Sequence, residues 1–418
     1  MEAEGRTVRT VQPMKILVVS PHPPNPKGGG SPTRLYYLLR ELAKVHEVDA
    51  IIGECWGGET PRELLEPLCT HLHVAKPLPR NPSGGVWERR FRRWVRWFVG
   101  PASDVRDVLR IREPVAASLA ASISRSRPDL IYVHHSMGAV VITGVSPQIP
   151  VLIDLHNVMC SYYFRSLKLA CNWRQRLEAL REALKMFAFE RQLFQSAAKF
   201  VTCSVQDASV VQRMAELSTV NVVPNGVDYE HFAGQPGGDP TNLLFLGTLS
   251  YLPNSDAVSY CVHEILPKIR STCPEVRLTV IGMEPPPEIL DLDNGSSVRI
   301  VGQVDDVRCY SRKSAIHLVP IRLGSGTRLK ILEALAMGRA VVSTSIGAEG
   351  LDLEDGIHLF IADTAEEFAR KAIMLINNPD LRERVALAGQ SFVRQNYDWP
   401  RVGEALLRAC HSAVNYSI

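Results

Sequence analysis

The sequence lacks most of the features that mark secreted, membrane-spanning and metal-binding proteins. Its nine cysteines are scattered, and no two stand in a Cys-x-x-Cys arrangement, so they predict neither a disulfide framework nor a metal site. No stretch of about 18 uninterrupted apolar residues occurs, and residues 1–13 lack an apolar core, so neither a spanning helix nor a signal peptide is expected. The net charge of +3 is too small to indicate a nucleic-acid partner. These absences predict a cytoplasmic protein with reduced thiols.

What the chain does have is enough apolar sequence for two ordinary cores. It contains 418 residues, of which 45% are hydrophobic and 22% are charged, as in globular proteins. A chain of this length favours two domains of about 150–200 residues each. Buried strands alternate with amphipathic helices in both halves, which predicts an α/β fold of two doubly wound domains.

Residues 315–351 contain the strongest functional signal in the sequence. An apolar run at 315–321 predicts a buried parallel strand, and the turn Gly324–Thr327 can expose backbone N–H groups. Thr327 is the expected N-cap of a helix that ends at Gly338. A glycine turn that leads from a strand into a helix is a common anion-binding arrangement.

The first turn of this helix is expected to carry two basic residues, which is unusual. Arg328 and Lys330 would meet the positive end of the helix dipole, at a cost of about 0.3–1 kcal/mol each. An anion bound at the helix N-terminus would reverse the sign of that cost. Lys330, Glu333 and Met337 share one helix face, where a cation and a carboxylate suit a phosphate and a ribose diol. A surface ion pair between Lys330 and Glu333, with Arg328 in solvent, explains the pattern equally well.

Turn sequences divide the chain and place possible ligand loops at strand ends. A strand at 14–20 leads into Gly28-Gly29-Gly30 and a helix at about 32–44, which resembles the opening of a doubly wound sheet. The loop is not a G-x-G-x-x-G fingerprint, so a plain flexible loop is an equal alternative. Turn chemistry at 224–226 marks a change of domain. We expect one domain at 14–218, completed by a helix at 400–418, and a second domain at 219–399.

Three histidines follow predicted strands in the first domain. His134 and His135 come after the strand 129–133, and His156 comes after the strand 151–154. Histidines at strand ends could hold a metal, but no spacing of histidine with carboxylate supports such a site here. Ordinary loop hydrogen bonds are the expectation for His134 and His135.

The segment 87–98, WERRFRRWVRWF, mixes aromatic residues with arginine. As a helix it would gather Trp87, Phe91, Trp94 and Phe98 on one face and four arginines on the other. That pattern favours a helix lying on an anionic membrane surface. A core helix with a solvated arginine face fits about as well, and binding to nucleic acid fits less well.

Residues 324–351, GSGTRLKILEALAMG…VVST…GAEGL, resemble the donor site of retaining glycosyltransferases of family 4, which have the GT-B fold. The resemblance extends more loosely to DLHN at 154–157 and to PNGVD at 224–228. It implies two Rossmann-like domains that face a central cleft, with the nucleotide-sugar donor bound by the second domain. It implies no metal and no other cofactor.

The resemblance also assigns roles to individual residues. Glu333 would hold the ribose hydroxyls, Arg328 and Lys330 would hold the diphosphate, and His156 would reach the donor sugar. The other expected donor-site residues lie in turns that approach the phosphates or the base: Gly29, Gly30, Gly247, Thr248, Gln303, Val304, Gly324, Ser325, Gly326 and Thr327. Ser325 replaces the first glutamate of the family's Glu-x7-Glu signature. Thr248 and Asn254 stand where most members have an arginine and a lysine.

The implied activity is transfer of a sugar, with retained configuration, from a nucleoside-diphosphate sugar such as a UDP-sugar to an acceptor hydroxyl. A lipid-linked or oligosaccharide acceptor is expected, in polysaccharide or glycolipid biosynthesis at the inner face of the plasma membrane. Two other classes stay open. One is a GT-B chain that binds nucleotide but no longer transfers, and the other is a GT-B epimerase acting on a UDP-amino sugar.

Overall fold

The apolar runs of the sequence form two parallel sheets in the computed structural model of the protein. The structure describes residues 12–55, 58–78, 105, 108–142, 148–167, 172–196, 198–217 and 219–415. The segment 87–98 lies outside these residues, so its expected membrane role stays a prediction. Within the described ranges, no helix combines the length and the apolarity needed to cross a membrane.

The first sheet has seven strands in the order β3-β2-β1-β4-β5-β6-β7. The strands are β1 (Lys15–Ser20), β2 (Glu47–Gly53), β3 (His71–Ala75), β4 (Leu130–His134), β5 (Val151–Leu155), β6 (Lys199–Thr202) and β7 (Asn221–Val222). Neighbouring strands run parallel. The order changes direction between β1 and β4, and in open α/β sheets ligands bind at such a switch point, outside the carboxyl ends of the strands.

The second sheet has six strands in the order β10-β9-β8-β11-β12-β13 and repeats this topology. The strands are β8 (Asp239–Leu246), β9 (Arg277–Ile281), β10 (Val298–Gly302), β11 (Ser314–Val319), β12 (Ala340–Ser343) and β13 (Phe360–Ile361). Its switch point lies between β8 and β11. The predicted fold class, two doubly wound α/β units, is confirmed.

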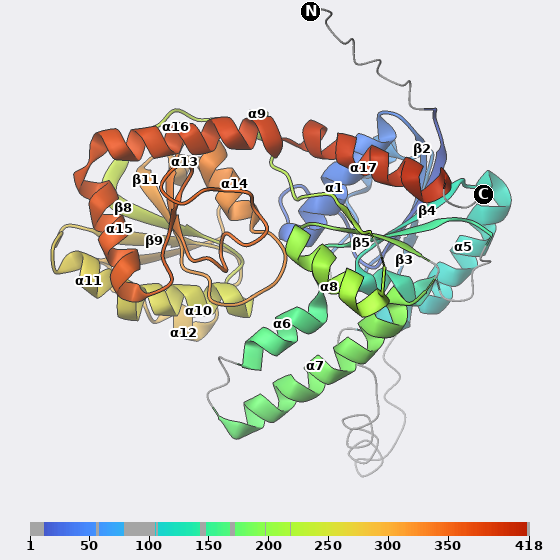
Figure 1. The fold of residues 1–418 in the computed structure, drawn as a ribbon, viewed down its shortest axis with the longest axis horizontal. Coiled ribbons are helices and arrows are strands. Elements are labelled where there is room, and N and C mark those ends of the chain that lie inside the picture. The colour runs from blue at the N-terminus through green and yellow to red at the C-terminus, as the bar shows by residue number, and fades with distance from the viewer. Residues whose placement is uncertain are drawn as a thin grey trace, which may run out of the picture.

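Helices cover both sheets, and the two units lie side by side in Figure 1. The helices of the first unit are α1 (Gly30–Ala43), α2 (Arg62–Leu65), α5 (Arg112–Ser126), α6 (Met159–Ser166), α7 (Trp173–Phe194) and α8 (Val205–Ala215). Those of the second are α9 (Tyr229–Phe232), α10 (Leu252–Tyr260), α11 (Leu266–Arg270), α12 (Pro287–Leu290), α13 (Arg308–Ser311), α14 (Leu329–Ala336), α15 (Ala365–Asn377) and α16 (Pro379–Asn396).

The last helix, α17 (Trp399–Asn415), returns to the first unit and packs along α1. The ring of Trp399 stacks on Tyr37 of α1, with 5.0 Å between the ring centroids. Trp399 is fully buried, and burial of so large a side chain contributes several kcal/mol to this packing. The C-terminal helix therefore ties the two units together.

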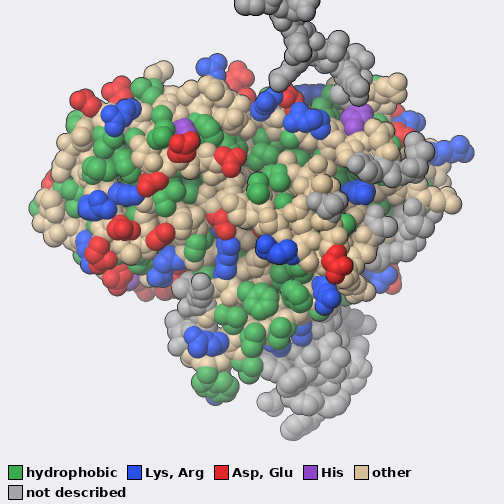
Figure 2. Space-filling view, viewed as in Figure 1, with side chains coloured by type: hydrophobic (Ala, Val, Ile, Leu, Met, Phe, Trp, Pro, Cys, Tyr) green, Lys and Arg blue, Asp and Glu red, His purple; other side chains and the backbone are tan. Residues whose placement is uncertain are grey.

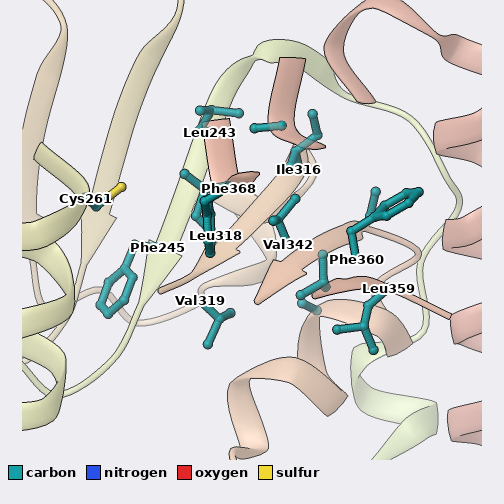
Figure 3. Packing of buried hydrophobic residues seen from close by; sticks show 14 of the residues in the cluster. Leu243, Phe245, Cys261, Ile316, Leu318, Val319, Val342, Leu359, Phe360 and Phe368 are labelled. Atoms are coloured by element: carbon teal, nitrogen blue, oxygen red, sulfur yellow. The ribbon is translucent and has the colours of Figure 1, made fainter. Parts of the chain in front are cut away.

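Alternate residues of the strands β1 and β8 belong to separate apolar clusters on the two faces of their sheets. In β1, Ile16 and Val18 face one cluster, whereas Leu17 and Val19 face the other. Figure 3 shows the core of the second unit, where Leu243 and Phe245 lie beside Ile316 and Leu318. Both faces are buried, which explains why these strands appear in the sequence as continuous apolar runs.

Some element boundaries differ from the expectations. A π-helical turn at Cys261–Ile265 separates α10 from α11, just before Pro267, which has no N–H for a regular helical bond. Strand β8 begins at Asp239, after the turn at 224–226 that was expected to mark the change of domain. The edge strand β3 was not predicted, because half-exposed histidines alternate with its apolar residues.

Candidate functional site

The predicted glycine turn lies where the two units meet. Gly324 and Gly326 have positive φ angles of 121° and 72°, which favour glycine. A Cβ on Gly326 would lie 2.1 Å from Asn157 Oδ1 and 2.8 Å from the carbonyl oxygen of His156. The turn can therefore contact the DLHN segment only because residue 326 has no side chain. The structure therefore brings together two motifs that lie far apart in the sequence.

The start of the following helix differs from the prediction. Helix α14 begins at Leu329, and its N-cap residue is Arg328, which has an extended backbone and makes no side-chain cap bond. Thr327 is not the N-cap, because its hydroxyl accepts a hydrogen bond from Asn225 Nδ2 at 2.7 Å. Arg328 therefore precedes the first turn of the helix, and our placement of it within that turn was wrong.

Arg328 supports the turn that leads into α14. Its guanidinium donates to the carbonyl oxygens of Ser325 (2.8 Å) and Gly326, and more weakly to Leu323 (3.4 Å). A Cβ on Gly324 would lie 2.5 Å from Arg328 Nη2, so glycine is needed there too. Burial lowers the pKa of Arg328. A direct bond from Arg328 to a diphosphate stays a prediction.

Lys330 lies in a recess that three predicted residues build. Its Nζ donates to Asn254 Oδ1 at 2.7 Å and lies 4.4 Å from the centroid of the Phe245 ring. Asn254 Nδ2 donates in turn to the carbonyl oxygen of Thr248 at 2.7 Å. A Cβ on Gly247 would lie 2.5 Å from Lys330 Nζ, so the glycine makes room for the ammonium group.

The charges of Lys330 and Glu333 are poorly compensated. Burial, and to a lesser degree the charge of Arg328, lowers the pKa of Lys330 to about 7. Burial raises the pKa of Glu333 to about 7, against the opposing effect of Lys330. Among the described residues no ion pair joins the two side chains within 4.0 Å, so the expected alternative of a surface ion pair is not formed. Two desolvated, partly accessible charges one helical turn apart are typical of a binding site.

The loop predicted to contact the base lies beside the same face of α14. Gln303 is exposed after β10, and Val304 packs with Leu246, Ile281 and Met337. Since Met337 follows α14 on the side of Lys330 and Glu333, the loop borders the expected diphosphate and ribose positions.

A buried ion pair occupies the equivalent position in the first unit. Arg34 of α1 donates to both carboxylate oxygens of Asp154 at 2.7–2.9 Å, and both side chains are fully buried. His134 hydrogen-bonds the same carboxylate at 3.0 Å. Burial opposes ionisation, but Arg34 and His134 hold the pKa of Asp154 well below its usual range. The remaining donor of Arg34, Nη1, reaches the carbonyl of Pro224 and Asn225 Oδ1.

Sequence reasoning missed this network. Its signal was a charged residue, Arg34, on the apolar stripe of α1 with Leu35 and Leu38, together with an aspartate at the end of a buried strand. His134 and His135 have hydrogen-bonding partners, as expected. Within the described ranges, no group of three or more His, Cys, Asp or Glu residues could hold a metal ion.

His156 and Ser325, where the two units meet, each have a buried polar atom that lacks a hydrogen-bond partner among the described residues. These atoms are His156 Nδ1 and Ser325 Oγ. Burial, with the charge of Arg34, lowers the pKa of His156, so its imidazole is neutral. A Cβ on Gly30 would lie 3.1 Å from His156 Nε2, whereas one on Gly29 would meet no atom within 4 Å. Buried polar atoms without a partner are rare in native proteins, and here they suit a polar ligand.

Arg165 of α6 bridges the two units near this site. It donates to the carbonyl oxygen of Gly324 at 2.6 Å and to Glu349 Oε1 at 2.7 Å. Its partner Glu349 lies in the GAEGL motif, so another pair of predicted motifs is in contact.

Comparison with protein families decides what kind of protein this geometry belongs to. Residues 28–231 match the model described as Glycosyltransferase Family 4, and residues 240–378 match the model described as Glycosyl transferases group 1. The two matches cover both sheets and most of the chain. The chain belongs to the group 1 glycosyltransferases of the family 4 type.

Relatives of this glycosyltransferase include proteins of known and unknown activity. An uncharacterised 44.6 kDa protein in the cps region of Klebsiella pneumoniae is 22% identical over 94% of this chain and 99% of its own. A phosphatidyl-myo-inositol mannosyltransferase of Mycobacterium tuberculosis is 32% identical over 44% of this chain and 52% of its own. The chain therefore matches about half of the mannosyltransferase.

Solved structures confirm that the fold is GT-B. Anabaena HepE in complex with UDP and glucose has a TM-score of 0.67 and 16% identity, over 96% of this chain and 100% of its own. Sucrose-phosphate synthase of Thermosynechococcus elongatus has a TM-score of 0.70 and 15% identity over the same shares. At these identities the similarity shows the fold alone.

Proposed function

We propose that this glycosyltransferase transfers a hexosyl group from a nucleoside-diphosphate sugar to an acceptor hydroxyl, with retention of configuration. The observation that carries the proposal is the pair of desolvated charges on α14. Lys330 and Glu333 lie one turn apart at the switch point of the second sheet and have no ion-pair partner among the described residues. A diphosphate would accept hydrogen bonds from Lys330, and a ribose diol would donate to Glu333.

The proposed donor position extends from the base loop to the junction of the units. The base would lie against Gln303 and Val304, and the diphosphate would lie over Gly247, Lys330 and the N-terminus of α14. The sugar would then reach Ser325 Oγ and His156 Nδ1, two buried atoms that have no hydrogen-bond partner among the described residues. The UDP and glucose bound in the crystal of Anabaena HepE support a UDP-sugar as donor.

The leaving diphosphate is the group that this site would stabilise. As the bond from the anomeric carbon to the diphosphate breaks, negative charge grows on the diphosphate oxygens. The ammonium of Lys330 and the backbone N–H groups at the start of α14 would offset that charge, while Arg328 holds the turn. Arg34 and His134 hold Asp154 ionised. Because their hydrogen bonds occupy both carboxylate oxygens, Asp154 is a poor nucleophile. A front-face transfer without a covalent intermediate is therefore proposed, without a metal or another cofactor.

The proposed acceptor is a lipid-linked or oligosaccharide hydroxyl, in polysaccharide or glycolipid biosynthesis. The relative in the cps region of Klebsiella pneumoniae and the mycobacterial mannosyltransferase support this class. The enzyme would then work at the cytoplasmic face of a membrane.

Calorimetric titration with UDP, GDP, ADP and dTDP tests the donor site directly. We expect micromolar binding of one diphosphate, weakened about 5- to 150-fold in Lys330→Ala and in Glu333→Ala, the range for losing a charged hydrogen bond. Lys268→Ala, an exposed lysine paired with Glu366, is the matched control and should bind like wild type. A folded protein that binds none of the four diphosphates would contradict the proposed donor site.

A further inference from the structure

Helices α6 and α7 form an arm that projects away from both sheets, at the bottom of Figure 1. Helix α7 presents a stripe of large apolar side chains to solvent along this arm. Its members, each at least 36% exposed, are Trp173, Leu177, Leu180, Leu184 and Phe187. Trp173 is the most accessible at 70%, and Leu184 is 54% exposed. Figure 2 shows hydrophobic side chains gathered on the projecting arm.

This stripe is distinct from the face that α7 uses for its own core. The buried face contains Ala183, Met186 and Phe194, and it also holds the carboxylate of Glu190. Glu190 accepts hydrogen bonds from the backbone N–H groups of Met159 and Cys160 at 2.8–2.9 Å, so it fixes α6 to α7. Helix α7 therefore has a separate buried face for its core contacts, and the exposed stripe is not part of that face. Several exposed large apolar residues in one row mark an interaction surface.

The charges beside the stripe are mostly positive. Helix α7 carries five basic residues and three acidic ones, and two of the acidic side chains, Glu182 and Glu190, are buried. Arg174 and Arg176 are exposed next to the stripe, whereas Arg181, one turn further along, is only 16% exposed and is paired with Glu182. The exposed half of α7 is an apolar row with a basic border.

The spacing of the stripe is also that of a coiled-coil seam, which raises the possibility of a second copy. The intervals of four, three, four and three residues would allow two α7 helices to pack along their stripes. The positions that border such a seam are Arg174, Arg176 and Arg181. An antiparallel pair would place the exposed arginines against each other, and in a parallel pair Arg176 would face Arg181 of the other copy, whose charge Glu182 partly offsets. Like charges at these positions oppose self-association.

We propose that the exposed face of α7 docks on an anionic lipid surface. The negative charge of the lipid headgroups complements the basic border, and the stripe would lie among the upper acyl chains. Trp173, at the N-terminal tip of the arm, has the amphipathic ring that membrane interfaces favour. The arm begins at Met159, three residues after His156, so the docking surface and the proposed transfer site are connected through α6.

Flotation with lipid vesicles tests this docking surface without any donor or acceptor. The full-length protein should float with vesicles of phosphatidylglycerol and phosphatidylcholine, bind far less to phosphatidylcholine alone, and be released by high salt. Leu177→Gln/Leu184→Gln should lower the partition coefficient at least about tenfold, because two apolar anchors are lost. Arg174→Gln/Arg176→Gln should lower it about 30-fold on the anionic vesicles, from about 1 kcal/mol for each arginine.

Matched variants on other surfaces control for apolarity and charge. Leu290→Gln/Leu387→Gln removes two exposed leucines of the second unit, and Arg401→Gln/Arg408→Gln removes two exposed arginines of α17. Both controls should bind vesicles like wild type, and circular dichroism should show that every variant is folded.

Four results would overturn the proposal. The first is a wild-type protein that does not float at all, and the second is flotation of the α7 variants that equals that of the wild type. The third is a loss of binding in the control variants as large as that in the α7 variants. The fourth is a wild-type dimer in solution that Leu177→Gln/Leu184→Gln dissociates. Unchanged flotation would instead assign membrane binding to another segment such as 87–98, and the dimer would assign the stripe to a second copy. Because the assay needs no sugar donor, the docking surface and the proposed transfer reaction can fail independently.

Discussion

The two sheets have the same strand order, yet their switch points treat buried charge in opposite ways. In the first unit, Asp154 receives hydrogen bonds from Arg34 and His134, and Arg34 has its remaining donors on the linker. In the second unit, Lys330 has one neutral partner, and Glu333 has no ion-pair partner among the described residues. A complete network serves structure, whereas an incomplete one leaves hydrogen-bonding capacity for a ligand.

The pKa values follow the same division. Arg34 and His134 hold the pKa of Asp154 far below its ordinary range despite burial. Burial moves the pKa values of Lys330 and Glu333 toward 7 from opposite sides. The same fold therefore stabilises one set of charges and destabilises the other. Topology alone does not identify the ligand site, but the state of its charges does.

Breaking the network of the first unit should give the largest effect. Arg34→Leu would leave the carboxylate of Asp154 buried without its cation, and we expect the free energy of unfolding to fall by about 3–5 kcal/mol. Urea denaturation followed by circular dichroism measures this loss. Arg40→Leu, on the same helix but 30% exposed, should cost about 1 kcal/mol or less. If the two variants lost equal stability, the buried network of the first unit would not have the structural role that distinguishes it from the second unit.

Removing the cation of the second unit should affect turnover and not folding. We expect Lys330→Ala to lower kcat about 100- to 1000-fold, the range seen when one group that stabilises transition-state charge is deleted. Turnover is measured as the release of nucleoside diphosphate from the sugar donor whose nucleotide the calorimetric titration has identified. Near wild-type turnover in a folded Lys330→Ala sample would contradict the role given to this side chain.

The pH dependence of donor binding should separate the two charges of α14. Lys330 must be protonated to bind a diphosphate, and its pKa of about 7 predicts that affinity falls above pH 7, by up to tenfold per pH unit. Glu333 must be ionised to accept the ribose hydroxyls, and its pKa of about 7 predicts a fall below pH 7. Calorimetry with a nucleotide sugar, whose diphosphate does not titrate here, should give a maximum near pH 7.

The variants sharpen this test. Lys330→Met should flatten the alkaline limb and Glu333→Gln the acidic limb. An affinity that does not change between pH 6 and pH 8 in the wild type would show that neither group binds the donor in the predicted protonation state.

The smallest expected effect has the opposite sign to that of Arg34→Leu. At pH 6 Lys330 is charged in both the folded and the unfolded state, and burial penalises only the folded one. Lys330→Met should therefore stabilise the fold by on the order of 1 kcal/mol, as often happens when a binding residue is replaced. The gain should be complete below pH 7, shrink as pH rises above the folded pKa of about 7, and vanish near the unfolded pKa of lysine, about 10.4. A loss of stability at pH 6 would mean that the lysine is better compensated than its contacts indicate.

The sequence predicted the central strands, the α14 segment and the contacting motifs because these signals are local, whereas it missed the edge strand β3. An apolar run, a glycine turn and an amphipathic stripe each lie within about 15 residues, where periodicity is informative. The Arg34–Asp154 pair was missed because its members are 120 residues apart and meet only through the order of the strands. Thr327 was misassigned for a similar reason: its hydrogen-bond partner Asn225 lies 102 residues earlier, and tertiary contact overrode its capping preference.

Asn225 belongs to neither unit alone. Its Oδ1 accepts from Arg34 of the first unit at 3.0 Å, and its Nδ2 donates to Thr327 of the second at 2.7 Å. The two halves of the chain are therefore not interchangeable cassettes. A chimaera that takes its second half from a relative with another donor would have to carry a compatible residue at each of these three positions, or the junction would be rebuilt around an unsatisfied arginine.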